Sequence, residues 1–291
     1  MGLTSPVVAC VWPLQCSLGE GPLWWGGGIW FTDIKQNMVY RFDPSGGAPR
    51  SWPAPSQVGF LAPLANGHFI AGTKAGLQDF DPATGGFVMM RAVEPDCPGN
   101  RLNDGAVDAQ GRLWFGSMDD GEAQPSGNLY RFHRGALSVM DKGYVITNGP
   151  AFSPDGRVLY HTDTLARRIY AFDLDQDGGL ANKRVFLEIE NGGGYPDGPV
   201  LDQEGCVWTG LFGGWSVRCY SPQGQLKQTV SFPVANVTKL AFGGPDLKTV
   251  YATTARKGLN AAALAAQPLA GALFCFSADT PGQACTAVEA D

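Results

Sequence analysis

The chain has 291 residues, of which 44% are hydrophobic and 16% charged, and its 40 glycines are typical of a globular protein rich in turns. The formal net charge of −6 comes without a basic stripe, which argues against nucleic acid as a partner. No apolar run is long enough to span a bilayer, and the N-terminal segment lacks a secretory-signal pattern, so we expect a cytoplasmic protein with no membrane partner.

The first predicted strand is "PVVACVWP", residues 6–13. It precedes a series of repeats in which a turn is followed by an apolar strand, at intervals of roughly 40 to 50 residues, the spacing of four-stranded propeller blades. In chain order the repeats begin at "GGGIWFTD", "NGHFIAGT", "AQGRLWFGS", "PDGRVLYHT", "QEGCVWTGL" and "DLKTVYATT". A second strand follows each of them, and in the sixth repeat a helix is predicted over residues 260–268 between the two.

Six such units predict an all-β fold, a six-bladed β-propeller that forms a single domain over residues 1–291. Residues 6–13 are the candidate to complete the last blade and close the ring. A β-sandwich is the alternative, and the six repeats at this period argue against it. The seven cysteines, an odd number without a CxxC pair, indicate reduced and mostly buried thiols rather than disulfides or a zinc site.

An oxygen-bearing side chain stands before a Gly-Pro pair in three of the repeats, namely Glu20, Asn148 and Asp197, each ahead of an apolar strand. Glycine permits unusual backbone angles and close approach, and proline stiffens the chain, so the preceding side chain can be held toward the funnel. We expect the segments that enter each innermost strand, the first strand of each repeat, to line one mouth of that funnel. In the third repeat Asn103 lies at the matching offset, with Asp104 beside it.

Two carboxylates and an amide oxygen are hard ligands suited to one divalent cation, and they do not distinguish calcium, magnesium, manganese, zinc and ferrous iron. The alternative is that X-Gly-Pro is only a turn before a strand. A second candidate metal site, "DLDQDGGLANKR", matches the first half of a calcium loop, but Arg184 stands where a bidentate glutamate is needed, so a solvated hairpin turn is the better interpretation.

At these residues the sequence resembles the regucalcin/gluconolactonase (senescence marker protein-like) family of six-bladed propellers. The resemblance extends from about residue 17 to residue 256 and is carried by several motifs in order: "LGEGPLWW", "RLNDGAVDAQGRLWFGSM", "ITNGPAFSPDG", "YPDGPVLDQEGCVW" and "FGGPDLKTVYATTAR". Within the family the sequence is most similar to bacterial sugar-acid lactonases such as the xylonolactonases.

The resemblance implies a divalent metal held by Glu20, Asn148 and Asp197, and a substrate bound by Arg101 and Asn103. It also implies a carboxylate that contacts sugar hydroxyls shortly after "GSM", for which Asp119, Asp120 and Glu122 compete, with Glu122 preferred.

The implied reaction is hydrolysis of an aldonolactone, possibly a pentonolactone, to the open sugar acid. The metal would polarise the carbonyl, and Asp197, which the family assigns as general base, would activate water. No obligate protein partner is evident. Two alternatives stay open: a phosphotriesterase-like metal hydrolase on the same scaffold, and a non-catalytic propeller that binds metal or a protein.

Overall fold

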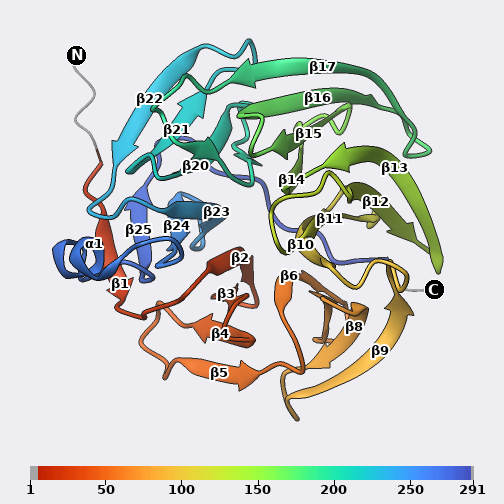
Figure 1. The fold of residues 1–291 in the computed structure, drawn as a ribbon, viewed down its shortest axis with the longest axis horizontal. Coiled ribbons are helices and arrows are strands. Elements are labelled where there is room, and N and C mark those ends of the chain that lie inside the picture. The colour runs from red at the N-terminus through yellow and green to blue at the C-terminus, as the bar shows by residue number, and fades with distance from the viewer. Residues whose placement is uncertain (1–5, 290–291) are drawn as a thin grey trace.

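Six antiparallel sheets stand around a central axis like the blades of a propeller in the computed structural model, which describes residues 6–289 (Figure 1). The first five residues of the N-terminal segment, on which the expectation of no leader partly rests, lie outside the described residues. The all-β six-bladed propeller predicted from the repeats is thus confirmed.

Each of the first four blades contains four consecutive strands. Blade 1 has β2 (Gly19–Trp25), β3 (Gly28–Asp33), β4 (Met38–Phe42) and β5 (Arg50–Pro53). Blade 2 has β6 (Val58–Pro63), β7 (Phe69–Thr73), β8 (Gly76–Asp81) and β9 (Gly86–Ala92). Blade 3 has β10 (Asn100–Val107), β11 (Leu113–Asp119), β12 (Gly127–His133) and β13 (Ala136–Tyr144). Blade 4 has β14 (Thr147–Phe152), β15 (Val158–Asp163), β16 (Arg168–Leu174) and β17 (Leu180–Glu188).

The last two blades depart from this pattern. In blade 5 the innermost strand is split into β18 (Tyr195–Pro196) and β19 (Val200–Leu201), which both pair with β20 (Val207–Phe212), followed by β21 (Ser216–Tyr220) and β22 (Leu226–Ser231). Blade 6 has β23 (Val237–Gly243), β24 (Thr249–Thr254) and β25 (Leu273–Ser277), with α1 (Ala261–Ala266) inserted before β25 and Asn260 capping the helix as expected.

The N-terminal strand β1 (Ala9–Trp12) completes blade 6, as predicted, by pairing with β25. Trp12 then packs on blade 1, with its ring 5.8 Å from Phe31 and 5.5 Å from Tyr40. The first and last strands of the described chain are therefore neighbours in one blade, so the ring of sheets is closed.

The order of strands corrects one expectation. The turn-plus-strand segments predicted to be innermost are the second strands of their blades, β3, β7, β11, β15, β20 and β24. The innermost strands precede them. Glu20 and Asn148 lie in these inner strands, and Asp197 lies between β18 and β19, the two parts of the split inner strand of blade 5. The glycines and prolines in these strands hid their β character from the sequence pattern.

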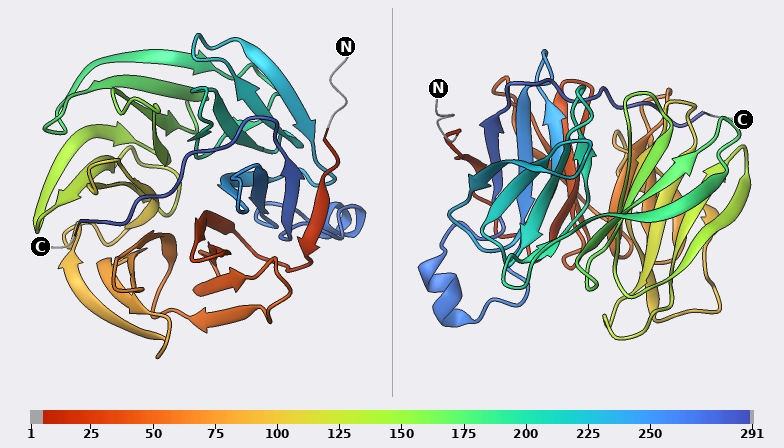
Figure 2. Two further views of the ribbon diagram at one scale, coloured as in Figure 1. Left: turned by 180° about the vertical axis from the view of Figure 1, so that it is seen from behind. Right: turned by 90° about the horizontal axis from the view of Figure 1, so that it is seen from above.

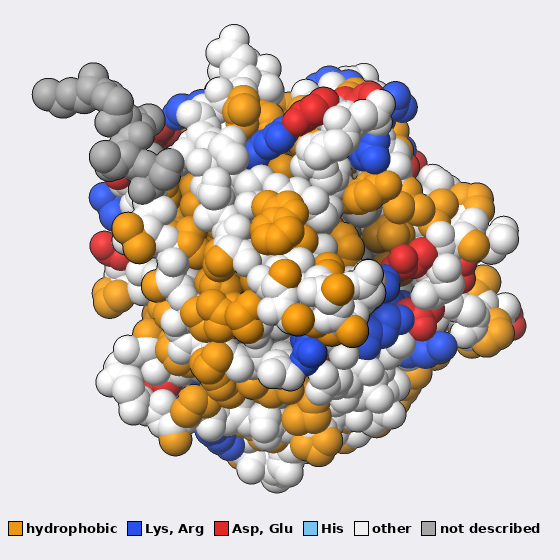
Figure 3. Space-filling view, turned by 60° about the vertical axis from the view of Figure 1, so that its left-hand side comes forward, with side chains coloured by type: hydrophobic (Ala, Val, Ile, Leu, Met, Phe, Trp, Pro, Cys, Tyr) orange, Lys and Arg blue, Asp and Glu red, His pale blue; other side chains and the backbone are white. Residues whose placement is uncertain are grey.

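The C-terminal segment crosses the rear mouth of the axis, where it runs over the centre of the view in Figure 2 (left). Gly282 N donates to Leu247 O, and Val288 N donates to Pro63 O, each at 2.8 Å, so the segment ties blade 6 to blade 2. The α1 insertion lies at the opposite face (Figure 2, right). On the side of the molecule around α1 and β1, apolar and polar side chains are interspersed without a large area of one charge (Figure 3).

The cysteines are free, as expected, but the prediction that most of them are buried is wrong. Only Cys16, Cys206 and Cys219 are buried, and Cys97 is exposed. No helix among residues 6–289 has the length and apolar character needed to cross a membrane.

His161 on β15 is a buried titratable group without a hydrogen-bond partner in the described residues. Its ring packs edge-on against Tyr144 at 4.9 Å, near the Asp141–Lys183 ion pair. Burial in these surroundings lowers the pKa of His161 to about 3, so the folded chain keeps the ring neutral where an unfolded chain would protonate it.

We therefore predict that the free energy of unfolding falls as pH drops from about 6.5 toward 3, because the unfolded state binds a proton that the folded state does not. At pH 5 the loss from this one group is about 2 kcal/mol. In urea titrations at pH 7 and pH 5, His161→Phe should lose less stability than the wild type by about that amount. His68→Gln, at a half-buried position, controls for removing a histidine, and equal losses for His161→Phe and wild type would contradict the assignment.

Candidate active site

The three oxygen-bearing residues hold the same position in the register of their innermost strands. Glu20 pairs with Thr32 and Asn148 with Thr162, and Asp197 N donates to Gly210 O at 3.0 Å. Directly after each, the pairing with the second strand shifts or breaks. The corresponding positions in blades 2, 3 and 6 directly follow the paired residues Val58, Leu102 and Val237, and they carry Gly59, Asn103 and Thr238. A bulge that turns the strand at one depth in every blade aims these side chains at the axis.

The glycine of each Gly-Pro pair is required by the local structure. Gly21 and Gly149 have φ values of +55° and +84°, which side chains with a Cβ rarely adopt. Gly198 is fixed by close approach instead, because a Cβ there would lie 2.4 Å from Asp104 Oδ2. The glycines thus allow the bulge and leave room beside the axis.

All the predicted site residues line one cavity of about 250 Å³ at the mouth opposite the C-terminal segment. They are Glu20, Arg101, Asn103, Glu122, Asn148 and Asp197. Glu20, Asn148 and Asp197 are at most 5% exposed, so they form the deep end of the cavity. A separate cavity of about 460 Å³ lies at the rear mouth, where Gln283 and Cys285 of the C-terminal segment cover it.

The two buried carboxylates form no ion pair with any Lys, Arg or His of the described chain. Glu20 Oε2 accepts from Gly21 N at 3.0 Å, and Asp197 Oδ1 accepts from Gly198 N at 2.7 Å. Burial raises the pKa of Glu20, and repulsion from Asp197 and Asp104 adds to that rise. Burial likewise raises the pKa of Asp197. Buried carboxylates of this kind are normally neutralised by a proton or a metal, and with Asn148 Oδ1 they offer hard oxygen donors that fit one divalent cation.

A chain of hydrogen bonds fixes the third oxygen donor. Asn148 Nδ2 donates to Thr164 Oγ1 at 2.9 Å, which turns Oδ1 toward Asn103, whose Nδ2 donates to it at 2.9 Å. Arg101 Nη1 donates to Asn103 Oδ1 at 2.5 Å, and Arg101 Nε donates to Asp120 Oδ1 at 2.8 Å. The side chains of Asn148, Asn103 and Arg101 are therefore held in place before any ligand binds.

Asn103 lies at the register position that corresponds to Glu20. Leu102 pairs with Ser117 as Gly19 pairs with Asp33, and Asn103 is the next residue, at the start of the bulge. From the bulge, Asn103 reaches sideways to blade 4, where its Nδ2 also donates to Thr147 O at 2.6 Å. The residue lies in the cavity next to the donors, but not as one of their set.

A buried ion pair that the sequence reasoning missed lies directly behind the donors. Asp104 in blade 3 and Lys239 in blade 6 pair across the axis, both at most 5% exposed. Asp104 also accepts from Gly149 N at 2.6 Å, beside Asn148, and both side chains crowd Gly198, beside Asp197. The lysine in the otherwise apolar "VTKLAF" was the available signal, since a charge in such a strand needs a partner.

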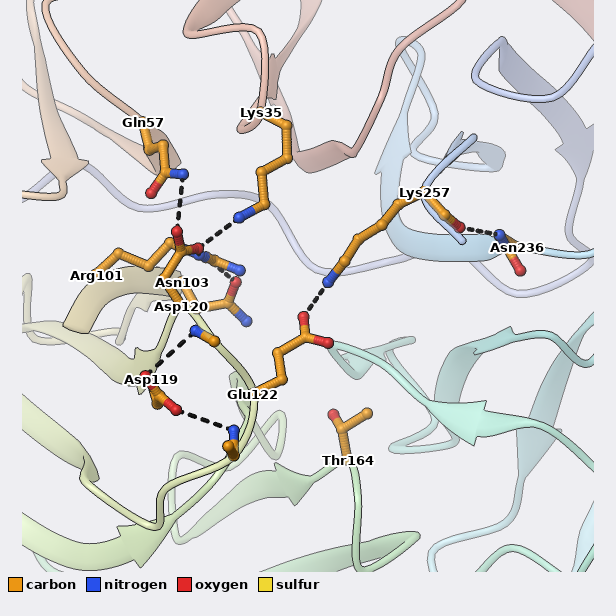
Figure 4. Close-up of polar contacts among 12 residues, drawn as sticks. Lys35, Gln57, Arg101, Asn103, Asp119, Asp120, Glu122, Thr164, Asn236 and Lys257 are labelled. Atoms are coloured by element: carbon orange, nitrogen blue, oxygen red, sulfur yellow. Dashed lines mark hydrogen bonds and ion pairs between the residues drawn. The ribbon is translucent and has the colours of Figure 1, made fainter. Parts of the chain in front are cut away.

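The three acidic residues that follow "GSM" form different contacts (Figure 4). Asp119 holds its own loop by accepting from the backbone N–H groups of Gly121, Ala123 and Gln124. Asp120 binds Lys35 and Gln57 in addition to Arg101. Only Glu122 among them lines the cavity, and its carboxylate pairs with Lys257, a second residue that sequence reasoning missed because it lies in a loop after β24.

Two other candidate metal sites find no support. Asp202, Cys206 and Cys219 bring ligand atoms within 4.8 Å of one another. However, Asp202 already accepts from the N–H groups of Glu204, Cys206 and the Trp208 indole, at 2.9 to 3.0 Å. The segment that resembles a calcium loop is the hairpin between β16 and β17, as expected, and Arg112 and Arg131 donate to its carbonyls.

Comparison with known proteins places this geometry in a family. Residues 18–256 match the SMP-30/Gluconolactonase/LRE-like region. The 6-deoxy-6-sulfogluconolactonase of Pseudomonas putida is 34% identical over 96% of this chain and 97% of its own. The L-arabinolactonase of Azospirillum brasilense is 34% identical over 89% and 87%, respectively. A crystal structure of the calcium-binding protein regucalcin from Agrobacterium tumefaciens superposes with a TM-score of 0.93 at 28% identity, covering 99% of this chain and 98% of that one. The chain therefore belongs to the SMP-30/gluconolactonase/LRE-like family.

Proposed function

We propose that the protein is a metal-dependent hydrolase that converts a sugar lactone into the open-chain sugar acid. The observation that carries this proposal is the set of two buried carboxylates and one amide oxygen, supplied by three blades and lacking a cationic partner, at the base of a cavity that Arg101, Asn103 and Glu122 also line. The two relatives named above as lactonases support the same reaction class. Their names differ in the sugar, so the substituents of the lactone ring are a separate question.

Glu20, Asn148 and Asp197 would hold the divalent cation. When bound, the cation supplies Lewis acidity for the lactone carbonyl and charge stabilisation for the oxyanion that forms on it. The donor set is compatible with calcium, magnesium, manganese, zinc or ferrous iron. Since the backbone bulges and the Asn103–Asn148 hydrogen bond already fix these side chains, little reorganisation is needed on binding.

The other residues bind the sugar and move the proton. Arg101 and Asn103 offer N–H donors beside the metal ligands, and Glu122 offers an acceptor nearer the solvent. Asp197 takes the proton of the attacking water as the water oxygen bonds to the carbonyl carbon. It then returns that proton to the ring oxygen as the carbon–oxygen ring bond breaks. The burial that raises the pKa of Asp197 makes it a stronger base than an exposed aspartate.

A non-catalytic calcium-binding role is the second candidate, because the regucalcin with the same fold is described as a calcium-binding protein. The two candidates share the metal site and differ in turnover. Metal binding and hydrolysis therefore need separate measurements.

Metal binding is predicted to raise the free energy of unfolding. Replacing one metal ligand is predicted to raise it in the absence of metal, whereas replacing a structural residue would lower it. At a free cation concentration of 100 times Kd, the wild type should gain about 2.7 kcal/mol in the free energy of unfolding, measured by urea titration of chelator-treated protein. Glu20→Gln removes a buried negative charge, so it should be more stable than wild type without metal and gain less when metal is added. Glu188→Gln, on the exposed strand β17, is the control. A metal-induced gain in Glu20→Gln equal to that of the wild type would contradict the ligand assignment.

Asp197→Asn is predicted to reduce kcat by about 10²- to 10⁴-fold, the usual contribution of a general base. The measurement is a pH-stat assay over pentono- and hexonolactones with each cation added back to stripped protein. Asp155→Asn, in an exposed turn, should retain wild-type turnover. If the wild type binds metal but hydrolyses none of the lactones, the calcium-binding role replaces the proposed one. If Asp197→Asn keeps full activity with its fold intact, another residue is the base.

A further inference from the structure

A second ion pair crosses the axis near the solvent, between the same two blades as Asp104 and Lys239. Glu122 lies in the loop after β11 of blade 3, and Lys257 follows β24 of blade 6, on the opposite side of the ring (Figure 4). Their side chains are 33% and 31% exposed, whereas the three proposed metal ligands are at most 5% exposed. All five residues line the same cavity, so the Glu122–Lys257 pair spans its outer part.

The backbones that carry this pair are fixed, and the two long side chains are its adjustable part. Lys257 N donates to Ser17 O at 2.9 Å, and Lys257 O accepts from Asn236 Nδ2 at 3.0 Å. The Glu122 loop is held by the three N–H groups that Asp119 accepts. A ligand that reaches Glu20, Asn148 and Asp197 from this mouth must therefore pass or enter the contact between the two charged groups.

The pair differs in character from the deeper one. Asp104 is buried and receives the N–H groups of Gly105 and Gly149 besides Lys239, so that pair is part of the interior. The outer pair is partly exposed, and ion pairs of this kind contribute little to stability. Opening it costs correspondingly little, and both groups then need partners.

A hydroxyl group satisfies both partners at once, because it donates to a carboxylate and accepts from an ammonium group. A phosphate or sulfonate accepts from Lys257 but cannot donate to Glu122, whose negative charge repels it. An apolar substituent satisfies neither. The pair is thus complementary to a neutral, hydroxylated substituent and includes a repulsive element against an anionic one.

We propose that Lys257, together with Glu122, selects lactones whose substituent remote from the carbonyl is a neutral hydroxyl group and disfavours anionic ones. The inference rests on the proposed function only in placing the lactone carbonyl at Glu20, Asn148 and Asp197. Lys257 acts here as a specificity-determining residue, and no chemical step depends on it.

The test compares glucono-1,5-lactone with its 6-phosphate, using the metal-loaded wild type, Lys257→Met and Glu122→Gln. Lys257→Met should raise KM for the neutral lactone about tenfold with kcat nearly unchanged, since the lost contact is made equally in ground and transition states. Glu122→Gln should raise the ratio of kcat/KM for the phosphate over the neutral lactone about tenfold or more, because the repulsive charge is gone.

Lys183→Met is the matched control, because Lys183 on β17 is the lysine of another partly exposed ion pair, with Asp141 on β13. It should leave kcat and KM for both substrates unchanged. If Glu122→Gln changed kcat/KM equally for both substrates, the proposal would be overturned, and the ion pair would have only a structural role. An unchanged KM for the neutral lactone in Lys257→Met would also overturn it.

Binding separates this proposal from the proposed function. Calorimetry with 1,5-anhydroglucitol, a cyclic polyol without a carbonyl, and with its 6-phosphate requires no turnover. If the wild type hydrolyses no lactone yet binds the neutral polyol in preference to the phosphate, and Glu122→Gln reduces that preference, the selection holds and the lactonase proposal fails. If the phosphate binds the wild type as well as the neutral polyol does, the selection is wrong whatever the enzyme hydrolyses.

Discussion

The constraint on which the site depends is the burial of negative charge on the propeller axis. Glu20, Asp197 and Asp104 lie near one another at no more than 5% exposure, and Lys239 is the only cation that pairs with one of them in the described chain. Moving a carboxylate out of water costs several kcal/mol unless a counter-charge replaces the water. The proposed divalent cation at Glu20 and Asp197 would remove that cost, and the fold keeps the two groups in place by backbone geometry rather than by a salt bridge. The cost of burying these two carboxylates would thus be the source of the proposed affinity for metal.

The propeller also explains why only three blades supply ligands. All six innermost strands change register at the same depth, so six positions are available at one level of the axis. The proposed metal ligands fill three of these positions, and Gly59, Asn103 and Thr238 fill the others. Gly59 has no side chain, Asn103 donates to Asn148 Oδ1, and Thr238 donates to Gly19 O, so these residues are glycine or are already bonded within the protein. In blades 3 and 6 the next residues along the bulge, Asp104 and Lys239, meet across the axis.

The sequence allowed the blade number, the closure by β1 and the convergence of Glu20, Asn148 and Asp197 on one cavity to be predicted, because each depends on a local and repeated pattern. It could not show which strand was innermost, since the bulge that aims Glu20 also fills that strand with glycine and proline and removes its alternation. Lys239 and Lys257 were missed for a different reason. Their partners lie 135 residues away in each case, and only closure of the ring brings blade 6 opposite blade 3.

The two cross-axis pairs divide the site into levels with different physical demands. The inner pair is buried, is supported by backbone N–H groups, and borders the proposed metal ligands, so a change there would alter their geometry. The outer pair stands on loops and is partly exposed, so its charges can change with less effect on the buried residues. A scaffold built in this way can keep one hydrolytic centre and vary the sugar that it accepts. In this chain the outer level holds one carboxylate and one ammonium group of equal and opposite charge, which is the composition expected for a neutral polyol.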